Sequence, residues 1–186
     1  ALLDFIGTVA DQGCSTFIIH ARIAILSGLS PKQNREIPPL NYARVYLMKR
    51  EFPALEIIIN GGITSLEACH NHLQHVDGVM VGREAYHNPW LLQQVDPVLF
   101  NTASLLQDRQ QVLALMTPYI TNALAHGTPL NHLSRHMLGL FHGQPGGKRF
   151  RRHLSEQAHK PGAALEILEA AFALTRQSAE SFCMET

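Results

Sequence analysis

The sequence predicts an α/β protein, in which three strand-and-helix units form a parallel sheet and a small helical bundle follows. Three short apolar runs, at residues 17–19, 57–59 and 79–81, have the composition of strands buried on both faces. Helical patterns separate these runs, and helices that alternate with strands are typical of right-handed parallel βα units. After about residue 96 the strand pattern disappears, so the remainder is expected to be helical.

Each expected strand follows a helix. The expected helices of this half run from Leu2 toward Gly13, from Asn41 to about Phe52 and from Thr64 to about His75. Gly13 is expected to close the first helix, and Asn41 is a favourable N-cap for the second. Thr64 and Glu67 form the spacing of a capping box, which predicts the start of the third.

The second half predicts a helical bundle. Asp108 is expected to cap a helix that Gly127 closes, with a kink at Pro118. Three more helices are expected at about residues 130–142, 148–159 and 163–180, separated by glycine and proline. Residues 96–107 have few periodic apolar positions, which predicts a boundary between a domain at 1–95 and a helical domain at 96–186.

Length and composition narrow the class of protein. A complete eight-stranded α/β barrel needs about 250 residues, so in 186 residues any barrel signature belongs to part of a barrel. A sheet of three strands has two bare edges, which predicts further strands from elsewhere in the protein or from another subunit. With no apolar stretch long enough to cross a bilayer and no basic leader, a cytoplasmic protein is expected.

Each predicted strand ends in polar residues or glycine. His20 follows the first strand, Asn60, Gly61 and Gly62 follow the second, and Gly82 and Arg83 follow the third. Ligands of α/β proteins bind at such strand ends, and glycine lets backbone amides approach an anion closely. The guanidinium group of Arg83 adds a positive charge and several hydrogen-bond donors. These features predict a phosphate site, although each one alone is also consistent with a plain turn.

The order of these turns indicates which part of a barrel is present. Phosphate sites recur in α/β barrels after the last two strands, and here two successive strands end in glycine-containing turns before the chain becomes helical. The fold class that follows is the C-terminal part of a TIM-type (β/α)8 barrel, with about three βα units, and then a small all-α bundle.

Two polar segments are candidate nucleic-acid contacts. The segment 22–39 is longer than ordinary βα loops, and its Lys32, Asn34 and Arg35 suit phosphates or bases, although a solvated loop fits equally well. The segment 144–160 carries five basic residues against Glu156, with an aromatic residue between them. That pattern suits RNA and also suits a solvated helix face.

The chain lacks the usual signatures of a metal or nucleophile site. Cys69, His70, His72 and His75 gather in one predicted helix, but only the last two share a face and no HExxH motif is present. No GxSxG motif occurs, and no cysteine lies at a predicted strand end. The sequence therefore predicts neither a metal ion nor a catalytic residue of its own. The net charge of zero gives no indication of nucleic-acid binding.

An ordered series of longer motifs carries a family resemblance. These motifs are FIIHAR, GLSPKQNREIPPLNYARVY, IIINGGI, DGVMVGREAYHNPW and RHMLGLFHGQPGGKRFRRHLSEQAHK. From about Leu2 to beyond Leu174, the chain resembles the C-terminal part of bacterial tRNA-dihydrouridine synthases of the A branch. The resemblance implies an FMN-containing barrel, a helical tRNA-binding domain, and NADPH-dependent reduction of the 5,6 double bond of D-loop uridines in tRNA.

The resemblance also implies roles for particular residues. FMN, chiefly its phosphate, would be held by His20, Asn60, Gly61, Gly62, Gly82 and Arg83. The tRNA would be contacted by Lys32, Arg35, Arg149 and Arg152. A full-length protein of this kind is expected to be a monomer.

Two departures from the family pattern affect the expected activity. Ile23 stands where this branch usually has lysine, which removes a cation near the flavin or substrate. The catalytic cysteine of the family lies in a motif like NVGCPS, which is absent, and Cys14 precedes a strand rather than following one. The chain alone is therefore expected to be inactive. A non-catalytic tRNA-binding remnant and another FMN-dependent barrel are the alternatives.

Overall fold

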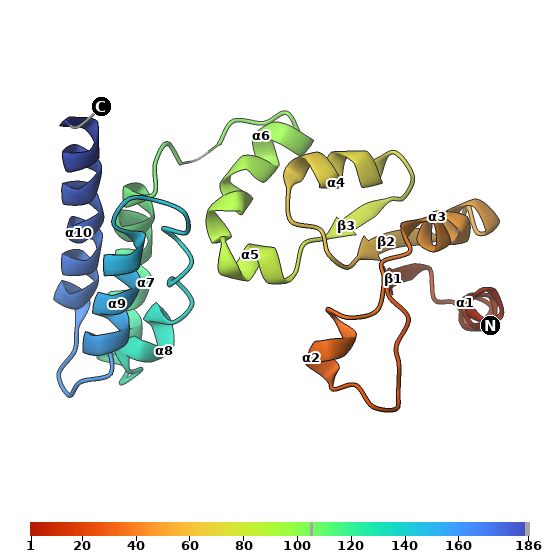
Figure 1. Cartoon of the computed structure of the whole chain (residues 1–186), viewed down its shortest axis with the longest axis horizontal. Coiled ribbons are helices and arrows are strands. Elements are labelled where there is room, and N and C mark those ends of the chain that lie inside the picture. The colour runs from red at the N-terminus through yellow and green to blue at the C-terminus, as the bar shows by residue number, and fades with distance from the viewer. Residues whose placement is uncertain (105, 185–186) are drawn as a thin grey trace. The chain divides into compact units, whose positions relative to one another are not determined.

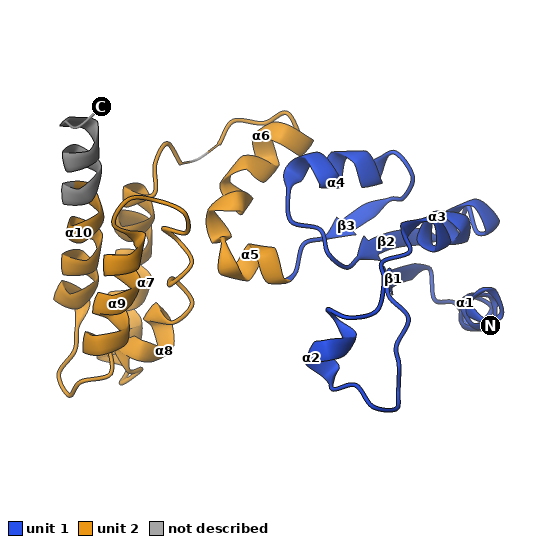
Figure 2. Ribbon diagram, viewed as in Figure 1, with its two compact units in different colours: residues 1–82 blue, residues 83–186 orange. Residues whose placement is uncertain are grey.

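The computed structural model describes residues 1–104 and 106–184, with backbone only for 177–184. The chain forms two compact units, Ala1–Gly82 and Arg83–Thr186, shown in different colours in Figure 2. None of the described helices is long and apolar enough to cross a membrane.

Unit 1 is a small parallel α/β layer (Figure 1). Its elements are α1 (Leu2–Ala10), β1 (Thr16–His20), α2 (Pro31–Asn34), α3 (Tyr42–Glu51), β2 (Glu56–Asn60), α4 (Leu66–Leu73) and β3 (Gly78–Met80). The strands lie in the order β1-β2-β3, and both neighbouring pairs are parallel. The predicted α/β class with three parallel strands is confirmed, with the third strand beginning one residue earlier than predicted.

Only one face of the sheet is buried. Phe17 and Ile19 of β1 alternate with exposed residues, and Ile57 and Ile59 of β2 are fully buried. Helix α3 packs on β2, and α4 packs on β3. Ile18 points to the other face and is 52 % exposed, so the expectation that β1 is buried on both faces is wrong for the chain by itself. A strand buried on one side alternates in this way.

Helix ends in unit 1 follow local hydrogen bonding. Asn41 caps α3 as predicted, because its side chain accepts a hydrogen bond from the Arg44 amide at 3.0 Å. The N-cap of α4 is Ser65, whose hydroxyl accepts from the Ala68 amide, so the prediction of Thr64 is wrong by one residue. Helix α1 ends at its C-cap Asp11, before Gly13.

Unit 2 is helical in its described part. Its elements are α5 (Arg83–His87), the 3₁₀ helix η1 (Pro89–Gln94), α6 (Val95–Leu99), α7 (Gln110–Ala125), α8 (Leu130–Ser134), α9 (Gly147–Gln157) and α10 (Leu165–Met184). Helices α7, α8, α9 and α10 pack around a core in which the rings of Phe141, Phe150 and Phe172 lie 4.8 to 5.4 Å apart. Such aromatic contacts add to the free energy of apolar burial.

One predicted helix of unit 2 begins as expected, and another is shorter than expected. Helix α7 begins beside Asp108 as predicted, because that carboxylate accepts hydrogen bonds from two amides of the first turn. Helix α8 stops at Ser134 rather than continuing to 142. The turns that replace its second half let Gly139 lie against α5, where a Cβ on Gly139 would be 2.2 Å from the His87 carbonyl oxygen.

The compact units divide earlier than the predicted boundary at 95/96. Residues 83–95 form short helices that belong to unit 2 and contact one another, and Trp90 packs against the core of unit 2. The Arg109 guanidinium lies 4.7 Å from the ring centre of Trp90, and the Tyr86 ring contacts the His136 ring edge-on. A helical pattern of five or six residues interrupted by Pro89 is too short to read from sequence, which explains why these elements were not predicted.

Candidate functional site

The strand ends that the sequence singled out lie along one edge of the sheet. His20 pairs with Asn60 across β1 and β2, and Asn60 pairs with Met80 across β2 and β3. Paired residues of parallel strands project to the same face. His20 and Asn60 therefore share the uncovered face, and the turns after Asn60 and Met80 leave from the same end of the sheet.

The Asn60-Gly61-Gly62 turn depends on having no side chain at its glycines. Gly61 has φ of 118° and Gly62 has φ of 72°, which are conformations that favour glycine. A Cβ on Gly62 would lie 2.6 Å from Cδ1 of Leu40, and one on Gly61 would lie 3.0 Å from Cε1 of His20. The turn is thus enclosed on one side by Leu40 and His20, which places its backbone close to the imidazole.

Tyr42 fastens this turn from α3. Its hydroxyl donates a hydrogen bond to the Gly61 carbonyl oxygen at 3.1 Å. A carbonyl held in this way is turned toward the helix, so the amides of the turn are oriented by a residue from another element. Sequence reasoning missed Tyr42, because nothing in its local pattern distinguishes it from an ordinary first helical residue.

The imidazole of His20 has a defined tautomer in its neutral form. Its Nδ1 accepts a hydrogen bond from the Arg22 amide at 3.1 Å. The proton of the neutral ring is therefore on Nε2, which makes Nε2 a hydrogen-bond donor. A donor at the end of β1 suits a carbonyl or anionic oxygen.

The turn at Gly82 is open. A Cβ added to Gly82 would meet no atom within 4 Å, in contrast to the enclosed glycines after β2. Arg83 follows directly as the first residue of α5. The backbone at Gly82 is consequently accessible from the space beside it, as a bound anion would require.

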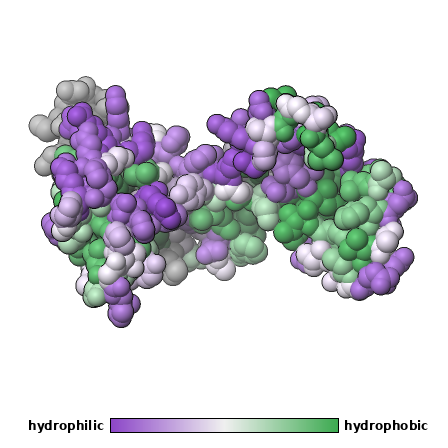
Figure 3. Space-filling view, turned by 90° about the horizontal axis from the view of Figure 1, so that it is seen from below, coloured by the Kyte–Doolittle hydropathy of each residue, from purple (hydrophilic) through white to green (hydrophobic). Residues whose placement is uncertain are grey.

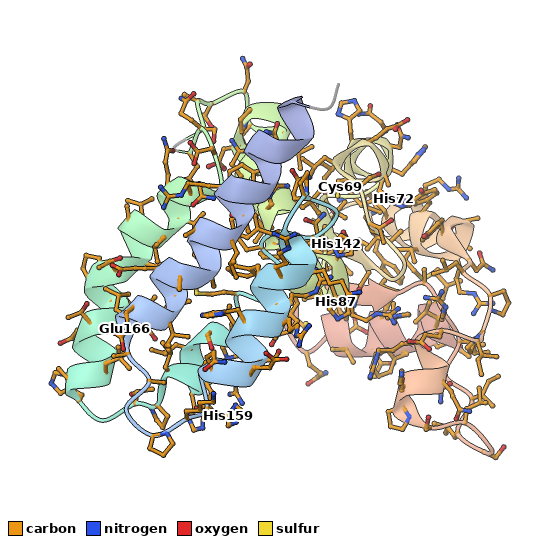
Figure 4. The ribbon with its side chains drawn as sticks, turned by 60° about the vertical axis from the view of Figure 1, so that its left-hand side comes forward. Cys69, His72, His87, His142, His159 and Glu166 are labelled. Carbon is orange, nitrogen blue, oxygen red and sulfur yellow. The ribbon has the colours of Figure 1, made fainter. Side chains whose placement is uncertain are left out.

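Behind the Tyr42 side chain lies a buried cluster between α3 and α4. The Tyr42 and His72 rings meet edge-on with centres 4.5 Å apart, and the Tyr46 hydroxyl lies 2.6 Å from Nδ1 of His72. Burial lowers the pKa of His72, and His75 lowers it further. Burial raises the pKa of the Cys69 thiol on the same helix (Figure 4). His72 and Cys69 are therefore packing residues here.

Stability of unit 1 is expected to fall as the pH drops below about 6.5, because of His72. The folded state holds the pKa of His72 below its ordinary value, so the unfolded chain takes up this proton first and is favoured as pH falls. Hydrogen exchange of the buried Ile57 and Ile59 amides at pH 7.5 and 5.5 measures the loss. His72→Gln should show a smaller loss, and equal losses in the two proteins would contradict this role.

An ion pair holds α3 to the sheet. Lys49 Nζ lies 2.8 Å from one carboxylate oxygen of Asp77, and the other oxygen accepts a hydrogen bond from the Ile57 amide at 2.8 Å. Burial acts to raise the pKa of Asp77, but these hydrogen bonds and the charge of Lys49 outweigh it, and the pKa lies below its ordinary value. This pair fixes the end of the sheet opposite the candidate site.

The long segment after β1 is a folded loop closed at its base. The Asn41 amide bonds the Ala21 carbonyl oxygen at 2.7 Å, and Arg22 Nε donates to the Pro38 carbonyl oxygen at 2.7 Å. The Asn34 side chain both accepts from the Ile25 amide and donates to its carbonyl oxygen. Asn34 is thus occupied by the loop itself, so the hypothesis that it contacts phosphates or bases is not supported.

The loop presents two of the predicted cations. Lys32 lies in α2, and Arg35 is the C-cap residue of that helix. Both side chains are exposed. The hydrogen bonds of Asn34 and the Ser30 cap order the backbone that carries them.

The predicted cations of unit 2 lie on α9. Arg149 and Arg152 are both exposed. Nε of Arg152 lies 2.7 Å from the Glu156 carboxylate one turn later, and this hydrogen bond raises the pKa of Arg152. An exposed pair of this kind contributes little to stability and leaves Arg152 partly neutralised.

The family model described as Dihydrouridine synthase matches residues 1–177. The chain belongs to the dihydrouridine synthase family. Among similar proteins of this family, the tRNA-dihydrouridine(20/20a) synthase of Vibrio cholerae is 58 % identical over 92 % of this chain and 53 % of its own length. Those of Shewanella oneidensis and Escherichia coli K12 are also 58 % identical, over 92 % and 93 % of this chain and 51 % and 50 % of their own. The chain thus spans about half the length of these dihydrouridine synthases.

The cysteines of this dihydrouridine synthase chain stand apart from the strand-end site. Cys14 precedes β1, whereas His20 is the last residue of that strand, as the sequence predicted. Cys69 is buried on α4, and the side chain of Cys183 lies outside the described residues. Ile23, which replaces the lysine usual in the resembling branch, is 57 % exposed and offers no charge.

Proposed function

We propose that this chain is part of a tRNA-dihydrouridine synthase and that its strand ends hold the phosphate of FMN. The observation that carries the proposal is the register of the sheet, in which Asn60 pairs with both His20 and Met80. This register sends the Gly61-Gly62 turn and the Gly82 turn away from one end of the sheet. The family match and the names of the similar proteins supply the substrate class.

The residues at these turns fit a phosphate. The Gly82 backbone is open where a side chain would otherwise stand. Of the two glycines after Asn60, Gly62 is exposed, and Gly61 packs against the His20 ring. Arg83 adds positive charge, and a hydrogen bond to a charged group contributes roughly 1.5 to 3 kcal/mol. FMN bound here would supply hydride transfer to the uracil ring, with NADPH as the source of electrons.

Other residues of unit 1 would position the cofactor. His20 would donate from Nε2 to an oxygen of FMN, and Asn60 would add its amide on the same face. Tyr42 would keep the Gly61 peptide oriented through its hydrogen bond. The isolated chain contributes no catalytic residue in this proposal, since Cys14 lies at the wrong end of β1.

The uncovered side of unit 1 supports a larger barrel. Ile18 is 52 % exposed, Phe5 of α1 is 61 % exposed, and β1 has no strand on its outer edge among residues 1–104 and 106–184. Figure 3 shows hydrophobic side chains gathered on the side of unit 1 that it views. We propose that further strands of a TIM-type barrel, from the half of the protein that this chain does not span, pair with β1 and cover this face.

The tRNA would be held by both units. Lys32 and Arg35 would act from the ordered loop of unit 1, and Arg149 and Arg152 would act from α9 of unit 2. Such cations position the phosphate backbone, while the base is placed by the active site. Because the proposed substrate is tRNA, we place the enzyme in the cytoplasm. We also propose that it acts as a monomer.

Complementation tests this proposal. This chain is co-expressed with the part of the Vibrio cholerae enzyme that lies outside the matched region, and the complex is called the complemented enzyme below. We expect a yellow complex that oxidises NADPH in the presence of unmodified tRNA and forms dihydrouridine, whereas the chain alone stays colourless. A stable complex that retains no flavin would contradict the proposal.

A non-catalytic tRNA-binding role is the second candidate. It is favoured by the separate core of unit 2, which includes Phe150 and Phe172 and gives the helical part its own packing. In that case the chain alone binds tRNA and the complemented enzyme forms no dihydrouridine. Activity of the complemented enzyme would exclude this reading.

A further inference from the structure

A groove with both apolar and polar lining lies between α9 and the segment 131–138 of unit 2. Its volume is about 310 Å³. Leu138 and Leu154 form its apolar part, and its polar side chains are those of Asn131, Ser134, Arg135, Ser155 and His159. Figure 4 shows His159 at the end of α9, where the chain turns toward α10. No carboxylate lines the groove, so its electrostatic character favours an anion.

Arg135 is the principal charge of this groove. Its side chain is exposed, and its Nε donates a hydrogen bond to Nε2 of His136 at 3.1 Å. Within the part of the chain that the structure describes, no carboxylate pairs with Arg135, in contrast to Arg152 with Glu156. The two terminal nitrogens of its fork are therefore available for a phosphate, which guanidinium binds through two parallel hydrogen bonds.

Two successive hydrogen bonds, through His136 and Tyr86, orient the Arg135 side chain. Because Nε2 of His136 accepts from Arg135, the neutral ring carries its proton on Nδ1. That nitrogen lies 3.1 Å from the Tyr86 hydroxyl and so donates to it. The Tyr86 ring also packs edge-on against His136, with ring centres 5.8 Å apart. Glu84, the acid of α5, accepts a hydrogen bond from the Asn88 side chain.

The side of α9 that lines the groove also carries two basic residues, Lys148 and Arg151. Ser155 and His159 are spaced by four residues, and the same spacing leads back from Ser155 to Arg151, with Lys148 one turn earlier. These residues share one side of the helix, and Phe150 and Leu154 are buried on the other. A chain of phosphates passing along this side of the helix would reach Arg135 at the groove.

We propose that this groove binds a backbone phosphate of RNA, with Arg135 as the phosphate ligand and with His136 and Tyr86 as its positioning residues. The inference rests on the proposed function, which supplies tRNA as the polyanion. It adds a tRNA contact to those that the resemblance implied for Arg149 and Arg152. An RNA phosphate with its ribose suits the groove, whose hydroxyl and imidazole groups can bond a ribose as well.

Binding of an unmodified tRNA transcript to the 186-residue chain tests the groove. Arg135→Ala is expected to weaken binding about tenfold at 0.1 M KCl and to lower the slope of log K against log salt by about 0.7 to 0.9, the value of one phosphate contact. Arg135→Lys should retain the slope with weaker binding. Tyr86→Phe should weaken binding two- to threefold with an unchanged slope, as expected for a positioning residue.

Arg50→Ala is the matched control, because Arg50 is an exposed arginine at the end of α3 and lies in unit 1. Unfolding curves of all variants should match that of the wild type, since each changed side chain is exposed. Equal losses of tRNA affinity for Arg135→Ala and Arg50→Ala, or an unchanged salt slope for Arg135→Ala, would contradict the proposed phosphate site in the groove. Neither result would contradict tRNA binding by the chain. Absence of tRNA binding by the wild type would overturn both the groove and the tRNA-binding part of the proposed function.

Discussion

Gly147→Ala is expected to destabilise unit 2 by about 3 kcal/mol, a loss at the upper end of overpacking effects. A Cβ on Gly147 would lie 2.1 Å from the Phe141 carbonyl oxygen. Neither partner can yield easily, because the contact is with backbone and the Phe141 ring packs against Phe150 and Phe172. Urea unfolding followed by the fluorescence of Trp90, the single tryptophan of the chain, reports on this unit.

Gly143→Ala is the control for this substitution. Gly143 has φ of 66°, and a Cβ there would meet no atom within 4 Å. Gly143→Ala should lower the free energy of unfolding by only about 1 kcal/mol, the cost of placing alanine in a left-handed backbone conformation. Similar losses for the two variants would show that the close approach of α9 to Phe141 is not what requires Gly147.

Gly61→Ala is expected to lower the affinity of the complemented enzyme for FMN by 10- to 100-fold, which corresponds to about 1.4 to 2.8 kcal/mol. The φ of 118° at Gly61 is unfavourable for alanine, and the new Cβ would press on the His20 ring. Relief of this strain turns the peptide that Tyr42 holds and displaces the imidazole. Titration of FMN fluorescence measures the change.

Gly28→Ala controls for a positive φ alone. Gly28 lies in the loop after β1 with φ of 84° and open space around its Cβ position. The Gly28→Ala variant should bind FMN with an affinity within twofold of that of the wild type. Retention of FMN affinity in Gly61→Ala would contradict the assignment of this turn to the cofactor.

The arrangement of strand ends follows from the sequence because parallel βα units leave little choice of topology. Apolar runs that end in His20 and Asn60, separated by helices, must place those residues at one edge of the sheet. The burial of β1 was harder to predict. Ile18 has the apolar character typical of a strand that is buried on both faces, but it is 52 % exposed because it lies on the uncovered face of the sheet.

Contacts between distant residues account for most of what the sequence could not show. Tyr42 reaches Gly61 across 19 positions, and Tyr86 meets His136 across 50. Asn34 has the composition of a phosphate contact, but its side chain closes a loop on Ile25. Local patterns identify polar residues without identifying their partners, so the sequence did not show that Asn34 bonds within its own loop, nor that His136 and Tyr86 hold Arg135.

Helix ends show the same limit at shorter range. Thr64 and Ser65 are both competent caps, and the choice of Ser65 depends on which residue has extended backbone geometry. Helix α8 ends at Ser134, and the turns that follow bring Gly139 against the His87 carbonyl oxygen. Periodicity alone extends that helix, because the apolar pattern continues through the turns.

The relative affinity of the complemented enzyme for FMN and riboflavin tests the phosphate site most directly, because the two ligands differ only by the phosphate. We predict that FMN binds at least about 100-fold more tightly, since several charge-assisted hydrogen bonds are involved. Arg83→Ala should reduce this preference about tenfold while leaving riboflavin affinity unchanged. Equal affinity for the two flavins, or an equal loss of both in Arg83→Ala, would contradict the proposed phosphate site.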